Sequence, residues 1–261
     1  MDRPQFLLGV LAAAALPAGP GAASAAAAPA VTRDDLAVAN HILAHENVVD
    51  GFGHVSVRDP GDPTRYWLSR SMAPALVGAA DILTYTLEST PVDPAGPPNY
   101  LERFIHGAIY KVRPDVQSIV HAHTDAVIPF GVSNVPLRAV FHMGSFLGAD
   151  GVPVFEIRDT SGPATDLLIS NNALGDALAR TLGSSSVALM RGHGMVAVGT
   201  SLQEAVFRAY YTGVDAKLES DALRLGSVKF LSADEARHAA TTNTGLISRA
   251  YDLWKRQVTR P

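Results

Sequence analysis

Two apolar runs in this chain each lead into histidine, and this pattern constrains the fold more than any other feature of the sequence. Ser118–Val120 precedes His121 and His123, while Val187–Met190 precedes His193, which stands between two glycines. Side chains at positions i and i+2 of a strand point to the same face, so His121 and His123 can converge on one ion. The sequence therefore predicts two strands whose ends meet and bring three imidazoles together.

Three imidazoles at strand ends are typical of a metal site. Neutral imidazole nitrogens bind first-row divalent metals, and a catalytic site needs three protein ligands and an open coordination position. Glu102, in a stretch that reads as helical 19 positions before His121, supplies a carboxylate. A lone histidine beside an apolar run more often packs in a core, and a lone helical glutamate is more often solvated. Only their combination favours a metal-dependent enzyme.

The remaining pattern predicts an α/β fold in which short strands alternate with helices. The expected strands cover residues 54–58, 66–69, 82–87, 118–123 and 152–157, with a hairpin over 187–198. The expected helices begin at Thr32, cover 101–112, 171–182 and 201–225, and end with one that starts between 232 and 235.

Composition excludes several classes of protein. The chain has 261 residues, of which 47% are hydrophobic and 18% charged, which is enough to bury one large core. A net charge of −4 without a Lys/Arg-rich cluster argues against a nucleic-acid partner. The absence of cysteine excludes disulfides and thiolate metal sites, so any metal must be held by His, Asp and Glu.

The first 30 residues form a segment of their own. Arg3 precedes the apolar run 6–11, and small residues surround Ser24, an arrangement typical of a secretory signal peptide. The run is too short to span a membrane. We expect residues 1–30 to be a signal peptide or a disordered Ala-rich leader and 31–261 to be the folded domain. The expected location is the periplasm or outside the cell, or the cytoplasm if the start codon is misplaced.

Four short motifs, in this order and spacing, resemble the class II aldolase/adducin family over roughly residues 35–225. They are Tyr100–Glu102, Arg113–Val116, Val120–Thr124 and Met190–Gly194. The resemblance implies a three-layer α/β/α sandwich around a mostly antiparallel central sheet, assembled as a homotetramer with sites at subunit interfaces.

The same resemblance implies roles for individual residues. His121, His123 and His193 would bind Zn²⁺ or Mn²⁺, with Fe²⁺ also possible, and Glu102 would be a fourth ligand or an acid/base beside the ion. The family's sugar-phosphate aldolases carry small or amide residues in a phosphate loop and a serine pair before the glutamate. This chain instead has Phe52 and His54 in that loop.

These departures favour a planar acid over a sugar phosphate. Tyr100 stands just before the glutamate, and Arg70 can grip a carboxylate with two hydrogen bonds. The chain looks more like the family members that decarboxylate hydroxylated aromatic acids. We therefore expect a divalent-metal-dependent carbon–carbon lyase, in which Glu102 or His54 returns a proton and Arg70 orients a small carboxylic acid.

Three alternatives stay open at this point. They are an aldolase acting on a non-phosphorylated hydroxy or keto acid, a non-haem iron oxygenase, and a non-catalytic adducin-like binding module. An oxygenase would use the same His and carboxylate ligands to activate O₂.

Overall fold

The structure is a computed structural model that describes residues 30–259. The leader expected over residues 1–30 lies outside the described residues, apart from residue 30, so its cleavage and the export of the protein stay predictions. In the described part, no helix combines the length and the apolar character that crossing a membrane requires.

The strands fall close to where the sequence predicts them. They are β1 (His54–Arg58), β2 (Arg65–Ser69), β3 (Ile82–Thr86), β4 (Ser118–Ala122), β5 (Val154–Phe155), β6 (Val187–Met190) and β7 (Gly194–Gly199). The α-helices are α1 (Arg33–His45), α2 (Phe104–Val112), α3 (Ile128–Val132), α4 (Arg158–Ser161), α5 (Asn172–Leu182), α6 (Leu202–Leu225), α7 (Ala233–Thr244) and α8 (Ile247–Thr259). The 3-10 turns are η1 (Pro74–Leu76), η2 (Ala79–Asp81), η3 (Leu101–Arg103), η4 (Asp125–Val127) and η5 (His142–Leu147).

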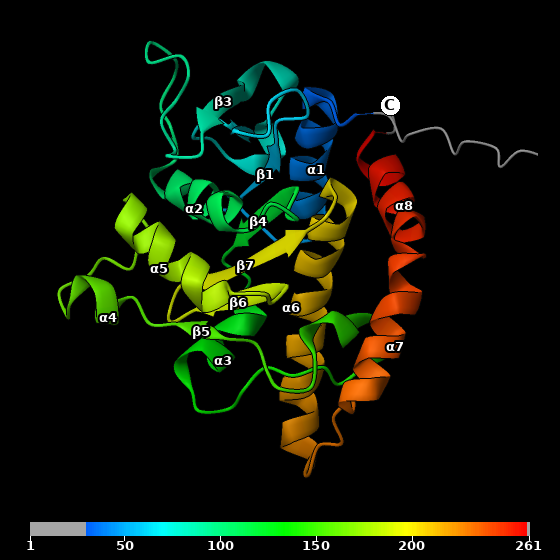
Figure 1. Ribbon diagram of the computed structural model, residues 1–261. Coiled ribbons are helices and arrows are strands. Elements are labelled where there is room, and N and C mark those ends of the chain that lie inside the picture. Colours follow the sequence, from blue (N-terminus) through cyan, green and yellow to red (C-terminus); the bar gives the residue numbers. More distant parts are fainter. Residues whose placement is uncertain (1–29, 260–261) are drawn as a thin grey trace, which may run out of the picture. The chain divides into compact units, whose positions relative to one another are not determined.

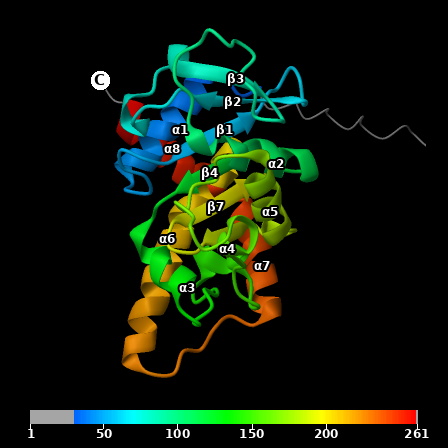
Figure 2. The ribbon, with the colours of Figure 1, turned by 90° about the vertical axis from the view of Figure 1, so that its left-hand side faces the viewer.

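The strands form one sheet in the order β3-β2-β1-β4-β7-β6-β5, which runs down the view of Figure 2. All neighbouring strands pair antiparallel except β5 and β6, which are parallel. In Figure 1, α2 and α5 cover one face of the sheet, and α1, α6 and α8 lie on the other. The three-layer fold with a mostly antiparallel sheet is therefore confirmed.

Alternation along the central strands separates two hydrophobic cores. On β4, Ile119 packs in the core under α2 and α5, while Val120 and Ala122 pack in the core under α1 and α6. His121 therefore points to the α2 face of the sheet, as its place between Val120 and Ala122 requires. The site described below lies on this face, at the end of β4.

Two details differ from the sequence prediction. The strand expected over 152–157 is only the two-residue β5, and Arg158 begins a short helix instead. β5 pairs with β6 at two positions only, Val154 with Leu189 and Phe155 with Met190. Two helices stand in place of the single last helix: α7 ends at Thr244, with Gly245 as its C-cap, and α8 starts at Ile247.

A close contact between α5 and α2 holds the segment that carries Glu102. A Cβ added at Gly175 would lie 2.5 Å from the carbonyl oxygen of Phe104 and 3.0 Å from Cβ of Ala108. Only glycine lets the two helices approach this closely. This contact requires glycine even though helix propensity favours alanine over glycine by about 1 kcal/mol.

We predict that Gly175→Ala lowers the free energy of unfolding by about 1 to 3 kcal/mol, because overpacking outweighs the gain in helix propensity. Urea denaturation would measure the change. Gly245→Ala is the matched control: Gly245 has a φ of −71°, and an added methyl group would meet nothing closer than 3.5 Å. A Gly175→Ala variant as stable as this control would contradict the packing argument.

Two buried carboxylates on α6 hold the segment that precedes η5. Asp215 Oδ1 accepts hydrogen bonds from the backbone N–H of Val140 (3.2 Å) and Phe141 (3.4 Å), and Glu219 Oε2 accepts one from Arg138 N–H (2.8 Å). Burial, only partly offset by these hydrogen bonds, raises the pKa of Asp215 to about 7, and the nearby Glu219 adds to the shift.

We predict that the wild-type protein gains stability relative to Asp215→Asn as the pH falls from 7 to 4. The folded protein binds this proton more tightly than the unfolded chain, whose Asp has a pKa near 3.8, so stability rises through this window. The relative gain should be at most about 4 kcal/mol, the value that a pKa shift from 3.8 to about 7 implies. Denaturation of both proteins across that pH range would measure it, and parallel curves would refute the assignment.

Candidate metal centre

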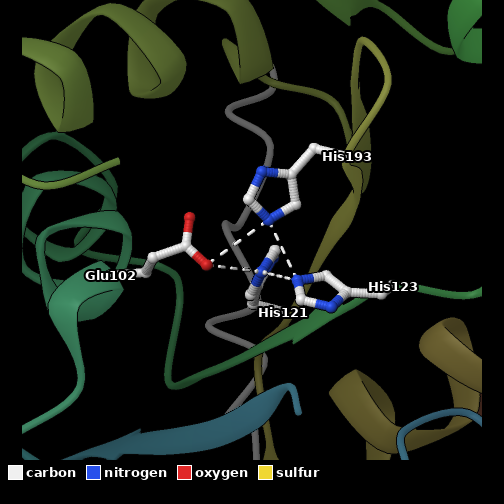
Figure 3. A group of neighbouring side chains, drawn as sticks. All are labelled: Glu102, His121, His123 and His193. Atoms are coloured by element: carbon white, nitrogen blue, oxygen red, sulfur yellow. Dashed lines mark hydrogen bonds and ion pairs between the residues drawn. The ribbon is translucent and has the colours of Figure 1, made fainter. Parts of the chain in front are cut away.

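Four side chains from three separate parts of the chain meet at the end of β4. His121 ends up opposite His54 in the β1–β4 pairing, His123 follows two residues later, and His193 lies in the turn between β6 and β7. Glu102 comes from η3, just before α2. Figure 3 shows the carboxylate and the three rings turned toward one another.

The ligand atoms of these residues lie within 4.8 Å of one another. His123 Nε2 is 3.1 Å from His121 Nε2 and 2.9 Å from His193 Nε2. Glu102 Oε2 is 3.3 Å from the Nε2 atoms of both His121 and His193. Ligands about 2.1 Å from a shared ion stand roughly 3.0 to 3.4 Å apart in octahedral or tetrahedral geometry, so these spacings fit a divalent metal.

Backbone carbonyls orient two of the rings. His121 Nδ1 lies 3.1 Å from the carbonyl oxygen of Met195, and His193 Nδ1 lies 2.8 Å from that of Leu167. A carbonyl can only accept, so the hydrogen of each neutral ring is on Nδ1 and the Nε2 lone pair faces the cluster. Glu102 is held in a similar way, because its Oε1 accepts a hydrogen bond from the N–H of Ile169 (3.1 Å).

Burial and mutual charge set the protonation of the cluster. Burial alone would raise the pKa of Glu102, but His121 and His193 outweigh it and hold that pKa well below its usual range. Burial, followed by the charges of His121 and His193, lowers the pKa of His123 to about 4. Burial also acts to lower the pKa of His193, but the hydrogen bond that its protonated form would donate to Glu102 leaves that pKa raised. An ionised carboxylate beside an unprotonated imidazole is the state that binds metal.

Glycines make the approach of His193 possible. Gly192 has a φ of 66°, which closes the turn between β6 and β7, and Gly194 packs directly against the backbone of Ala122 on β4. A side chain at Gly194 would push the β7 end of the hairpin away from β4.

The other expected site residues, His54 and Arg70, lie outside the four-residue cluster. His54 lies beside the cluster, with its ring centroid 5.1 Å from that of His121. Arg70 is not part of the cluster, because its Nε pairs with Asp81 Oδ1 at 2.7 Å. Its charge reaches Tyr100: burial raises the pKa of Tyr100, and Arg70 partly offsets this. The roles of all these residues stay predictions.

Sequence reasoning missed the polar residues behind His54. Ser56 and Tyr110 are buried, and a series of hydrogen bonds joins them to His106. Two spacings could have indicated them: Ser56 is two positions from His54 on a strand, and Tyr110 is four from His106 on a helix.

A cavity of about 300 Å³ opens beside the cluster, between the turn at residues 47–50 and residues 123–125. Its lining includes His123, Asp50 and Thr124, so a molecule in the cavity touches the cluster directly. The volume is at the small end of the usual range for ligand pockets. Phe52, whose side chain is largely exposed, stacks near His123 with ring centroids 6.3 Å apart.

Comparison with known proteins agrees with this geometry. Residues 34–218 match the model of the class II aldolase and adducin N-terminal domain. The protein named decarboxylase tropJ, from Talaromyces stipitatus, is 38% identical over 241 residues, covering 84% of this chain and 90% of that protein. A 3,4-dihydroxyphthalate decarboxylase from a Terrabacter species is 32% identical over 195 residues, covering 69% of this chain and 76% of the relative.

Among solved structures, an aldolase II superfamily protein from Pseudomonas syringae superposes with a TM-score of 0.71 at 22% identity, covering 87% of this chain and 91% of that one. The chain belongs to the class II aldolase/adducin family, and it is an enzyme of the lyase type. The family resemblance inferred from the four motifs is thereby confirmed. Class II aldolases use a divalent metal, and the Glu102–histidine cluster is a group that can hold one.

We predict that the wild-type protein, stripped with chelator and reloaded with Zn²⁺ or Mn²⁺, holds about one ion per chain. His121→Ala should lose it, because the cluster then has too few ligands. Metal analysis of the desalted protein measures the content, and a rise in melting temperature on adding the metal is an independent reading. His142→Ala is the control, since His142 is exposed and outside the cluster. Equal metal content in wild type and His121→Ala would place the ion elsewhere.

Proposed function

We propose that this chain catalyses the divalent-metal-dependent decarboxylation of a hydroxylated aromatic carboxylic acid. The observation that carries the proposal is the position of the four-residue cluster beside a group of rings. His54 lies with its ring centroid 4.5 Å from that of Tyr100, and the ring of Phe52 stacks near that of His123. The relatives named as decarboxylases support the same reaction.

We assign Zn²⁺ or Mn²⁺ to the cluster on the chemistry of its donors. Three imidazoles and a carboxylate suit either ion, and both act as Lewis acids. A divalent ion held there supplies charge that stabilises negative charge developing on a substrate oxygen. An organic cofactor that accepts the electron pair, such as pyridoxal phosphate or thiamine diphosphate, is then not needed.

The chain's own residues bind and orient the acid and manage one proton. The bond between the carboxylate carbon and the ring carbon breaks, CO₂ leaves, and the electron pair stays on the substrate. One proton from solvent, passed on by Glu102 or His54, then forms the new C–H bond. The rings of Phe52 and Tyr100 offer flat apolar faces on which an aromatic acid stacks.

Arg70 completes the proposal as the residue that orients a carboxylate. Its pairing with Asp81 uses Nε, and its two terminal nitrogens have no hydrogen-bond partner among the described residues. Two terminal N–H groups can hold one carboxylate oxygen each or share one. Asp81 fixes the guanidinium on the Tyr100 side of the site, so the substrate would extend from the cluster toward Tyr100.

Two other reactions at this site predict different outcomes. An aldolase acting on a hydroxy or keto acid would cleave a carbon–carbon bond without releasing CO₂. A non-haem iron oxygenase would use the same histidine and carboxylate ligands and would consume O₂. The homotetramer implied by the family resemblance also stays a prediction.

We predict that the protein reloaded with Zn²⁺ or Mn²⁺ releases one CO₂ per product molecule from a hydroxylated aromatic acid, at the same rate under nitrogen and in air. His123→Ala should lower kcat/KM by at least about 100-fold, because the ligand set is broken. CO₂ trapping together with product analysis measures both. Dependence on O₂ would favour the oxygenase, and carbon–carbon cleavage without CO₂ would favour the aldolase.

A further inference from the structure

A line of buried polar side chains connects the metal centre to the interior of the α2 layer. His54 and Ser56 share a face of β1, and His106 and Tyr110 are one turn apart on α2. Tyr110 Oη is 2.8 Å from Ser56 Oγ, and Ser56 Oγ is 2.7 Å from His106 Nδ1. His106 Nε2 is in turn 2.7 Å from His54 Nδ1.

The hydroxyl of Tyr110 sets the direction of these hydrogen bonds. Tyr110 is 1% exposed, and Ser56 is the hydroxyl's only hydrogen-bond partner among the described residues. Burial raises the pKa of Tyr110, so the hydroxyl keeps its hydrogen. A buried hydroxyl that failed to donate would cost about 1 to 3 kcal/mol, so Tyr110 donates and Ser56 Oγ accepts.

Each later bond follows from the first. Ser56 has its own hydrogen left to donate, and it donates it to Nδ1 of His106. A neutral His106 that accepts at Nδ1 carries its hydrogen on Nε2 and donates it to Nδ1 of His54. His54, accepting at Nδ1, then carries its own hydrogen on Nε2.

In this series of hydrogen bonds, the Nε2–H of His54 is the one donor that has no partner among the described residues and is free to bind a substrate. It makes no hydrogen bond to any described residue, and it lies on the side of the ring away from His106. The ring stands between Tyr100 and His121, with centroids 4.5 and 5.1 Å away. His54 is buried, with 3% of its surface exposed.

We propose that Tyr110, Ser56 and His106 fix His54 as an Nε2–H donor, and that this donor binds an anionic oxygen of the substrate beside the metal centre. The identity of that oxygen, carboxylate or phenolic, rests on the proposed function. A neutral imidazole that accepts at one nitrogen and donates at the other has no free lone pair. His54 therefore does not act as a base, and of the two proton carriers considered above only Glu102 can take up a proton. A fixed donor aimed at developing negative charge stabilises the transition state.

The hydrogen positions can be measured directly. In protein with ¹⁵N-labelled histidine, the nitrogen that carries hydrogen is distinguished from the bare one by its chemical shift and its coupling to ring protons. We expect hydrogen on Nε2 in both His54 and His106, with signals assigned by their loss in His54→Gln and His106→Gln. Hydrogen on Nδ1 of either residue would overturn the proposal.

Ser56→Ala tests whether this series of hydrogen bonds contributes to the rate of the reaction. Without the serine hydroxyl, His106 loses the donor that fixes its hydrogen, so its labelled signals should shift toward a mixture of the two forms. We expect kcat to fall about 10-fold while KM changes less than about twofold, the loss typical of one well-placed hydrogen bond. Ser118→Ala is the matched control, since Ser118 is a buried serine on the neighbouring strand that donates to the backbone oxygen of Ser56.

The outcomes separate this proposal from the proposed function. If the wild-type protein releases no CO₂ from any acid tested, the proposed function fails, and the labelled spectrum still decides where the hydrogen of His54 lies. If CO₂ is released but Ser56→Ala has the kcat of Ser118→Ala, the proposed function stands and the role of the line is refuted. His54→Gln, which keeps an N–H near the position of Nε2, should retain more activity than His54→Leu.

Discussion

The register of β4 against its two neighbours is the constraint on which the site depends. His121 stands opposite His54 on β1, and Ala122 stands opposite Met195 on β7. The first pairing puts two imidazoles on the same face of the sheet, and the second brings the carbonyl of Met195 to the Nδ1 of His121. A slip of one residue would turn His121 into the core under α1 and α6 and would separate it from Glu102.

Around that register, the fold controls where hydrogen atoms lie. Carbonyl groups of Met195 and Leu167 hold hydrogens on the outer nitrogens of His121 and His193, which leaves the inner nitrogens free for a cation. On the other side of His121, Tyr110 starts a series of donations that ends at His54. One part of the site is therefore organised to bind positive charge and the adjacent part to bind a negative oxygen. Metal-assisted decarboxylation requires both, because the carboxylate must be held while negative charge builds up next to the ion.

Family membership and chemistry are separate conclusions in this protein. The chain belongs to the class II aldolase/adducin family, and the solved structures at about 20% identity show its fold alone. What distinguishes this chain is the set of side chains around the cluster: His54 in the loop that binds phosphate in the sugar enzymes, with Phe52 and Tyr100 beside it. Buried His106 and Ser56 then give His54 a defined hydrogen-bonding role that an isolated surface histidine would lack.

The local pattern of the sequence determined many of the secondary-structure elements and the family of this protein. Strand alternation placed His121 and His123 on one face, the capping residues Thr32 and Ser201 began their helices as predicted, and the motif order indicated the family. Other features depended on contacts between distant segments. The strand expected over 152–157 pairs with β6 at two positions only, Arg70 pairs with Asp81, and His54 finds its partner His106 on α2, 52 positions along the chain. Periodicity records which face of an element a residue occupies, but the partner that satisfies a buried polar atom is decided only when the elements pack.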